Sequence, residues 1–200
     1  MCIRDRFKIL KNARKRIAVS KIFSEVCEKA GIADVSFKEN KVTSMFNSMT
    51  CTKSYKPPYN VCHIGGMSLH KGFQLFRNAV NLLPQNIPLI FTVIDHRLTK
   101  SSDEYSSVWN GYEVRFIAPI AMEKMAEFYA SQDVLVAPSI WPESFGLVTR
   151  EAISAGLWVI ASDSGALAEP LKVEPSKGTI TRPNHIEDLV DALKDLPNQL

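Results

Sequence analysis

Two glutamates, Glu143 and Glu151, stand in the stretch of this chain that is richest in ligand-binding groups, APSIWPESFGLVTREA at residues 137–152. The pattern predicts a buried strand, a proline-bearing loop and a helix that starts near Phe145. The free backbone N–H groups of the first helical turn can bind an anion. Eight helical positions turn about 80° past complete turns, so the two carboxylates could reach different parts of one extended ligand. Spacing alone leaves open an alternative, in which Glu143 and Ser144 cap the helix and Glu151 faces solvent.

A possible phosphate site comes earlier, in the sequence HIGGMSLHKG at residues 63–72. Lys71 follows the glycine turn Gly65-Gly66 and precedes an expected helix. A cation in this position can neutralise a diphosphate and stabilise a departing nucleotide. The plainer alternative is a surface lysine at the start of a helix.

Other kinds of site find little support in the sequence. Ser139 and Ser144 lack a suitably placed histidine motif, which argues against a serine hydrolase. The chain has no GxGxxG motif, no Walker A loop and no Asp-x-Asp pair. We interpret Trp141 and Trp158 as packing residues. Four side chains are of types that bind zinc, but their spacing in the sequence is not that of zinc ligands. They are Cys51, Cys62, His63 and His70. We therefore expect no metal ion and no cofactor.

From residue 59 onward, segments with strand and helix patterns alternate. Strands are expected at residues 59–64, 87–94, 113–118, 134–137, 157–161 and 179–180. Helices are expected at residues 72–83, 122–131, 145–154, 166–171 and 186–196. Such alternation predicts an α/β fold, a Rossmann-like parallel sheet with helices on both faces. Ligands bind at the carboxyl ends of such strands, so the loops that carry Lys71, Glu143 and Glu151 should lie together.

The residues before position 59 have a different character. A short strand at 17–20 and a helical segment that ends at Gly31 precede a polar linker, residues 34–58, with one short strand at 34–37. The first six residues, MCIRDR, look like translated sequencing adapter. We therefore expect residues 1–6 to be an artefact, residues 7–58 to be the remnant of an N-terminal domain with its linker, and residues 59–200 to be one domain. The chain is then a fragment, and its first part should pack poorly.

Composition narrows the functional classes further. Apolar residues make up 46% and charged residues 22% of the 200 residues, the mix of an ordinary globular protein. The net charge of +3 is too weak to indicate nucleic-acid binding. The longest apolar stretch, residues 87–94, is far shorter than the roughly 20 residues that span a bilayer. Four cysteines without a CxxC pair favour reduced thiols and a cytoplasmic location.

Taken in order, these motifs resemble a known family. The Glu143–Glu151 stretch resembles the Glu-x7-Glu signature of retaining GT-B glycosyltransferases, family 4 or glycosyl transferases group 1. The strand QDVLVAPS at 132–139, the Gly65-Gly66 and Lys71-Gly72 pairs, and the continuation through Glu169 resemble the same family. The resemblance covers residues 59–196. It implies the C-terminal, donor-binding half of a GT-B fold.

The resemblance also implies roles. Glu151 would accept hydrogen bonds from the ribose hydroxyls of a sugar nucleotide, Glu143 would contact the donor sugar, and Lys71 would contact the diphosphate. Many relatives carry an arginine at the position of Gly66, and His70, Lys53 or Lys56 are the candidates to replace it. The catalytic pair implied is Lys71 and Glu143. The full donor-binding set implied is Gly65, Gly66, Lys71, Glu143, Ser144, Phe145, Gly146, Leu147 and Glu151.

The implied reaction transfers a sugar from a nucleoside diphosphate to an acceptor hydroxyl with retention of configuration and without a metal ion. The expected partners are a nucleotide sugar and a glycan, lipid-linked or other hydroxyl acceptor, with no nucleic acid. Peripheral contact with the inner membrane face would come through the missing N-terminal domain. The rival hypothesis is a non-catalytic module of the same fold, which binds the nucleotide sugar or acts as a scaffold.

Overall fold

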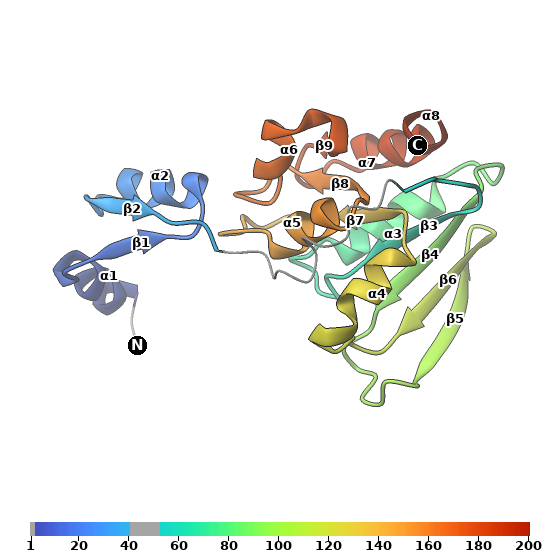
Figure 1. Ribbon diagram of the computed structural model, residues 1–200, viewed down its shortest axis with the longest axis horizontal. Coiled ribbons are helices and arrows are strands. Elements are labelled where there is room, and N and C mark those ends of the chain that lie inside the picture. Colours follow the sequence, from blue (N-terminus) through green and yellow to red (C-terminus); the bar gives the residue numbers. More distant parts are fainter. Residues whose placement is uncertain (1–2, 41–52) are drawn as a thin grey trace.

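A computed structural model describes the backbone at residues 3–40 and 53–200, and the side chains at residues 7–40 and 53–200. The described chain forms two sheets (Figure 1). A two-stranded sheet belongs to residues 3–40, which we call the N-terminal unit. A seven-stranded sheet lies within residues 59–200.

The larger sheet is parallel except at one edge. Its strands run in the order β5-β6-β4-β3-β7-β8-β9, and only the β5–β6 pair is antiparallel. The strands are β3 (Tyr59–His63), β4 (Leu89–Ile94), β5 (Glu104–Trp109), β6 (Tyr112–Ile117), β7 (Val134–Ala137), β8 (Trp158–Ser162) and β9 (Gly178–Thr181). This arrangement confirms the α/β fold expected from the alternating segments.

Strand β5 is the one strand of the larger sheet that the sequence analysis missed, and α1 (Ile3–Asn12) in the N-terminal unit was not predicted either. Strand β5 pairs with β6 through a tight hairpin at Asn110 and Gly111, both of which have positive φ angles, 46° and 85°. An Asn-Gly pair between two strands is the strongest short signal of such a hairpin. The first three residues of β5 are exposed, which weakens the apolar pattern by which a strand is recognised.

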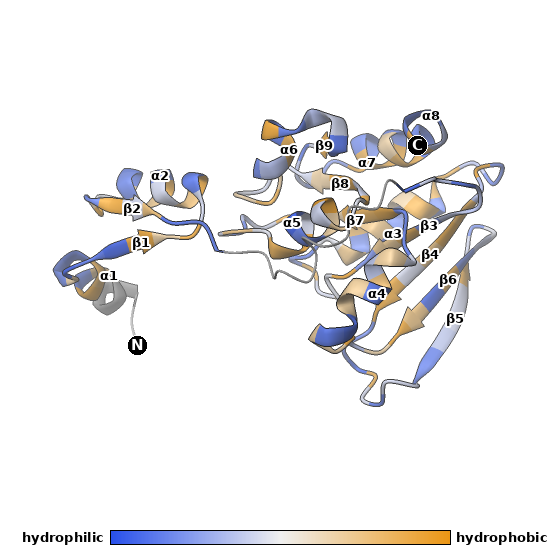
Figure 2. Cartoon of the chain, in the orientation of Figure 1, coloured by the Kyte–Doolittle hydropathy of each residue, from blue (hydrophilic) through white to orange (hydrophobic). Residues whose placement is uncertain are grey.

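Helices cover both faces of the larger sheet (Figure 1). On one face, α3 (Phe73–Asn81) and α7 (Ile186–Lys194) pack on a core that includes Val134 and Val136. On the other face, α4 (Met125–Ala130), α5 (Leu147–Ser154) and α6 (Glu169–Val173) pack on a core that includes Leu135 and Ala137. Successive residues of β7 thus point to opposite cores, as alternation along a strand requires. In the hydropathy view, apolar residues concentrate in these central strands (Figure 2).

Three short elements complete this part of the chain. They are two 3-10 turns, η1 (Met122–Lys124) and η2 (Pro175–Lys177), and the terminal helix α8 (Leu196–Gln199). In the described residues, no helix has the length and apolar character needed to cross a membrane.

The N-terminal unit consists of α1 (Ile3–Asn12), β1 (Arg16–Ala18), α2 (Lys21–Lys29) and β2 (Val35–Phe37), with β1 and β2 parallel. Helix α2 begins at an N-cap, Ser20, whose hydroxyl accepts from the Phe23 amide. Six large apolar side chains among the described residues of the unit are between 38% and 58% exposed. They are Ile9, Leu10, Ile17, Phe23, Val26 and Phe37. This exposure agrees with the expected poor packing, while the origin of residues 1–6 stays a prediction.

Candidate functional site

The loops that follow β3 and β7 meet at the carboxyl edge of the larger sheet, as predicted. The ammonium Nζ of Lys71, after β3, lies 2.9 Å from Oε1 of Glu143, after β7. The two side chains are 35% and 19% exposed, so this ion pair is partly desolvated and still reachable from solvent. A cation and a carboxylate on converging loops form the centre of the candidate site.

Glu143 is fixed from several directions. The hydroxyl of buried Ser139 donates to Oε1 of Glu143 over 2.6 Å. The Glu143 amide donates to the carbonyl of Ser164, and the Glu143 carbonyl accepts from the Ala166 amide over 2.7 Å. The loop after β8 therefore holds the backbone while Ser139 orients the carboxylate. The sequence reading considered Ser139 only as a nucleophile. Its signal as a site residue is its place two residues after the end of a buried strand.

Two glycines allow these loops to approach one another. Gly72 has a φ of +76°, and a Cβ atom there would overlap the carbonyl oxygen of Pro138. Only glycine fits this position without strain. Gly66 has a φ of +63°, and a Cβ atom there would overlap the ring of His96. The space into which a side chain at position 66 would project is therefore filled by His96.

Two cavities flank the ion pair. The smaller, about 150 Å³, is also lined by His63, Gly65 and His96. The larger, about 420 Å³, is lined mainly by the loop that enters α5. Lys71, Ser139 and Glu143 border both cavities. The residues that border only the larger one include His70, Trp141, Pro142, Ser144, Phe145, Gly146 and Leu147. A ligand that passes over the ion pair can therefore occupy both.

His63 holds the floor of the smaller cavity in place. Its ring nitrogens lie 3.0 Å from two carbonyl oxygens, Nδ1 from that of Val136 and Nε2 from that of Gly66. The ring is buried, and burial lowers the pKa of His63. A neutral imidazole donates to only one of the two carbonyls. We read His63 as a structural tie between β7 and the glycine turn.

The N-terminus of α5 faces the larger cavity. The helix is preceded by Gly146 in the left-handed conformation, and in the described chain no side chain caps it. The reading of Glu143 and Ser144 as a helix cap is therefore wrong. The helix begins at Leu147 rather than near Phe145, because Gly146 breaks the helical backbone. The uncapped amides of its first turn can donate to an anion.

Glu151 lies behind this surface. Only 6% of the residue is exposed, and the Tyr129 hydroxyl donates to Oε2 over 3.1 Å. Burial raises the pKa of Glu151. Residues 143–146 are not helical, so the predicted rotation between the two glutamates along one helix is wrong. The alternative of a solvent-facing Glu151 is wrong too. Glu151 does not border either cavity, and its contact with ribose stays a prediction.

The candidates for an additional phosphate cation lie in different places. The His70 ring borders the larger cavity beside Trp141, with 6.0 Å between ring centres. Lys53 donates to the Tyr129 carbonyl, and Lys56 is exposed away from both cavities. His70 is therefore the best placed of the three. Trp141 is 68% exposed, so its interpretation as a packing residue is wrong.

Cysteines and potential metal ligands do not add to the site. Cys62 is buried, and burial raises its pKa, while Cys27 lies in α2. Cys2 and Cys51 fall outside the described residues. In the parts of the chain that the structure describes, no group of three His, Cys, Asp or Glu side chains is placed to hold a metal ion.

Comparison with known proteins places this arrangement in a family. The family model described as Glycosyl transferases group 1 matches residues 49–199. The chain belongs to this family. Among curated relatives, sulfoquinovosyl transferase SQD2 of Arabidopsis thaliana is 29% identical over 138 residues, which are 68% of this chain and 26% of the relative. A D-inositol 3-phosphate glycosyltransferase of Rhodococcus erythropolis is 37% identical over 84 residues, 42% of this chain and 19% of the relative.

Solved structures agree on the fold. Sucrose-phosphate synthase from Thermosynechococcus elongatus superposes with a TM-score of 0.72 and 20% identity over 97% of this chain and 52% of the other. Anabaena Alr3699/HepE, solved in complex with UDP-glucose, superposes with a TM-score of 0.72 and 18% identity over 97% of this chain and 57% of the other. These glycosyltransferase neighbours confirm the expected GT-B type of α/β sheet. The group 1 chain spans about half the length of these solved proteins and a smaller share of the curated relatives.

Proposed function

We propose that this chain is the donor-binding part of a retaining glycosyltransferase, which moves a hexose from a nucleoside diphosphate to an acceptor hydroxyl. The observation that carries the proposal is the Lys71–Glu143 ion pair, which borders both cavities beside the uncapped N-terminus of α5. Family membership supports it, as does the relative solved with UDP-glucose. Residues 7–58 would then be the end of an acceptor domain and its linker.

The diphosphate fits between Lys71 and α5. The Lys71 ammonium supplies a full positive charge, and the first-turn amides of α5 supply donors and the positive end of the helix dipole. These groups can balance a diphosphate without a metal ion. Backbone N–H groups of Phe145, Gly146 and Leu147 would bind sugar and diphosphate oxygens, with Gly65, Gly66 and Ser144 at the margins. Glu151 would accept from the ribose hydroxyls.

The sugar fits beside Glu143. An ionised carboxylate accepts about four hydrogen bonds, so Glu143 can hold Lys71 and Ser139 and still accept from sugar hydroxyls. Ser139 fixes the direction of that carboxylate before the donor arrives. Such preorganisation is how a positioned carboxylate lowers the cost of orienting a substrate.

In the proposed reaction the bond between the anomeric carbon and the diphosphate oxygen breaks, and the acceptor oxygen bonds to the same face of that carbon. The acceptor proton passes to the leaving diphosphate. Lys71 stabilises the negative charge that develops on that leaving group. The acceptor would be a glycan, a lipid-linked sugar or another hydroxyl compound. We propose a cytoplasmic location with peripheral contact at the inner membrane face.

Calorimetric titration with UDP and GDP tests the proposal. The wild type should bind at least one of them, and Lys71→Ala should bind it about ten- to a hundredfold more weakly, since a charge-assisted contact is lost. The loss should shrink at high salt. Lys194→Ala is the matched control, because it removes an exposed lysine on α7 that pairs with Asp191 and borders neither cavity. Absence of binding by the wild type, or equal affinity in all three proteins, contradicts the proposal.

A further inference from the structure

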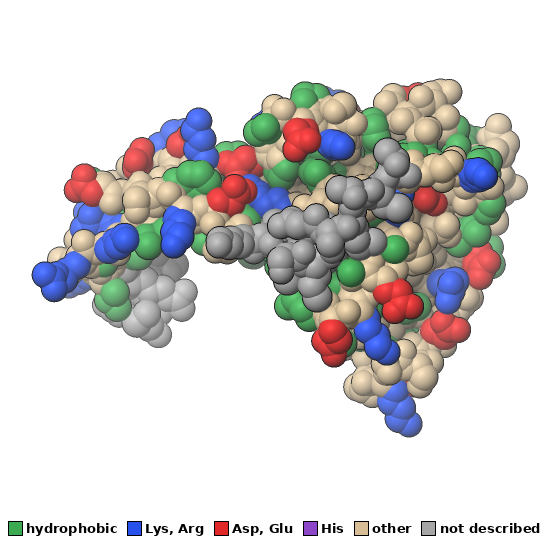
Figure 3. Space-filling view, viewed as in Figure 1, with side chains coloured by type: hydrophobic (Ala, Val, Ile, Leu, Met, Phe, Trp, Pro, Cys, Tyr) green, Lys and Arg blue, Asp and Glu red, His purple; other side chains and the backbone are tan. Residues whose placement is uncertain are grey.

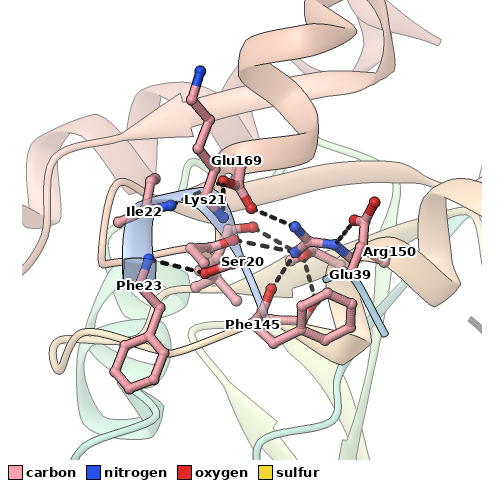
Figure 4. A network of polar contacts seen from close by, with 12 residues as sticks. Ser20, Lys21, Ile22, Phe23, Glu39, Phe145, Arg150 and Glu169 are labelled. Carbon is pink, nitrogen blue, oxygen red and sulfur yellow. Dashed lines mark hydrogen bonds and ion pairs between the residues drawn. The ribbon is translucent and has the colours of Figure 1, made fainter. Parts of the chain in front are cut away.

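Arg150 is a buried cation that the proposed chemistry does not use. It lies on α5, one residue before Glu151, and is only 7% exposed. Its Nη1 donates to the carbonyls of Phe145 and Ala166, the latter over 3.3 Å. Its guanidinium also lies over the Phe145 ring, 4.1 Å from the ring centre (Figure 4). Arg150 therefore contacts the loop that borders the larger cavity through both the backbone and the ring of Phe145.

The rest of the guanidinium is held by two carboxylates. Nε lies 2.9 Å from Oε1 of Glu39, which belongs to the N-terminal unit. Nη2 lies 2.6 Å from Oε2 of Glu169, at the start of α6. Glu39 is 54% exposed and Glu169 only 17%, so Glu169 is the more desolvated partner. One planar guanidinium thus joins the site loop, α6 and the N-terminal unit.

Glu169 extends the connection to α2. Its Oε1 accepts from the amides of Lys21 and Ile22 over 3.1 Å and 3.2 Å, in the first turn of α2. Next to them, the Ser20 hydroxyl donates to the carbonyl of Ser144 over 2.6 Å (Figure 4). Charged side chains of both signs gather where the N-terminal unit meets the rest of the molecule (Figure 3). The unit therefore contacts the site loop directly through the Ser20–Ser144 hydrogen bond, and indirectly through Arg150.

We propose that Arg150 is a positioning residue that fixes the 144–146 loop and couples it to the docked N-terminal unit. The inference rests on the proposed function, because that loop is where the donor is proposed to bind. When a ligand orders the loop, the unit should open less often, and the docked unit should in turn favour ligand binding. Such coupling is reciprocal by thermodynamic necessity.

The geometry requires arginine. Its planar fork donates in several fixed directions at once, whereas a lysine ammonium is a single point on a flexible stem. A lysine at position 150 would keep the charge but lose most of the contacts to the two carbonyls and two carboxylates. If Arg150 only balanced the charge of Glu39 and Glu169, lysine would replace it well.

Hydrogen exchange and UDP titration on the full chain test the coupling. The variants are Arg150→Met and Arg150→Lys, with Arg115→Met as control, since Arg115 forms an exposed pair with Glu104 on the far edge of the sheet. In both Arg150 variants the amides of Lys21, Ile22 and residues 145–147 should exchange at least about tenfold faster, as expected for local opening. UDP affinity should fall by about tenfold. In the wild type, UDP should slow exchange at Lys21 and Ile22.

The results of these experiments distinguish a positioning role of Arg150 from simple charge balance. A lysine variant with wild-type exchange and affinity overturns the inference in favour of simple charge balance. UDP that binds the wild type without slowing exchange at Lys21 and Ile22 also overturns it. If an Arg150 variant does not fold, Glu39→Gln at the exposed carboxylate takes its place. In that variant UDP should slow exchange at Lys21 and Ile22 less than in the wild type, and an unchanged slowing contradicts the coupling. If the wild type binds neither UDP nor GDP, the proposed function fails, while faster exchange in the variants without nucleotide still supports the positioning role.

Discussion

Replacing Glu151 by glutamine should change nucleotide affinity and protein stability in opposite directions. Glutamine keeps the shape of the side chain and can still accept from the Tyr129 hydroxyl. It loses the charge-assisted part of the proposed bonds to ribose, which are worth about 1.5–3 kcal/mol. Since about 1.4 kcal/mol is a tenfold change in affinity, UDP should bind roughly ten- to a hundredfold more weakly.

The stability effect has the other sign because burial raises the pKa of Glu151. A carboxyl group whose folded pKa is raised stabilises the fold while it is protonated, and this contribution is lost as the pH rises through the folded pKa. Glutamine does not titrate. The free energy of unfolding of Glu151→Gln should therefore increase relative to that of the wild type as the pH rises. This increase should begin at a pH of about 4, the usual pKa of glutamate, and continue through the raised pKa.

Urea unfolding at a series of pH values, combined with UDP calorimetry, measures both effects on the same two proteins. Tyr129→Phe is a useful companion, because it removes the hydroxyl that donates to Glu151 and leaves the carboxylate in place. Equal UDP affinity in wild type and Glu151→Gln, with folding intact, would refute the ribose role. A stability difference that does not vary with pH would refute the reasoning from burial.

Three further predictions concern the fold that supports the site. Gly72→Ala should lower the free energy of unfolding by at least about 2 kcal/mol in urea denaturation, because a left-handed backbone is costly for alanine and its Cβ would overlap Pro138. Phe76→Ala should lower it by about 3–5 kcal/mol, since Phe76 is fully buried among aromatic rings, and a smaller loss would mean a collapsed cavity. Arg97 holds the pKa of buried Asp95 below its usual range. The stability that Asp95 contributes should therefore be present above a pH of about 4 and be lost as the pH falls further. Thermal melting of Asp95→Asn between pH 3 and 7 should show no such loss.

The sequence predicted the central parallel strands β4, β7 and β8 well because each is a nearly continuous apolar run. Strand β4 is an example, with buried residues at five of its six positions. Strand β5 was not predicted because it is an edge strand with exposed residues, so its hydropathy pattern is weak. The sequence feature that indicates it is the Asn110-Gly111 turn that follows it. Helix α5 was predicted two residues too early because Gly146 takes a left-handed conformation just before Leu147, where the helix begins, and this conformation cannot be read from the apolar pattern.

The candidate site was predictable in part for similar reasons. The meeting of Lys71 and Glu143 follows from their places after neighbouring parallel strands, which sequence order and the rules for such sheets supply. The burial of Glu151 was not predictable, because it depends on Tyr129 from a distant segment. The exposure of Trp141 and the role of His96 over Gly66 likewise depend on loops whose course only tertiary structure fixes.

The most direct test of the central claim is a two-dimensional amide NMR spectrum of the chain, recorded with increasing UDP. A nucleoside diphosphate bound between Lys71 and α5 should shift the amide signals of Gly65, Lys71, Gly146 and Leu147 first and most strongly. The same titration on Lys71→Ala should require a higher UDP concentration for the same shifts. Shifts confined to other parts of the chain, or no shifts at about 1 mM UDP, the upper end of ordinary KM values, would contradict the proposed donor site.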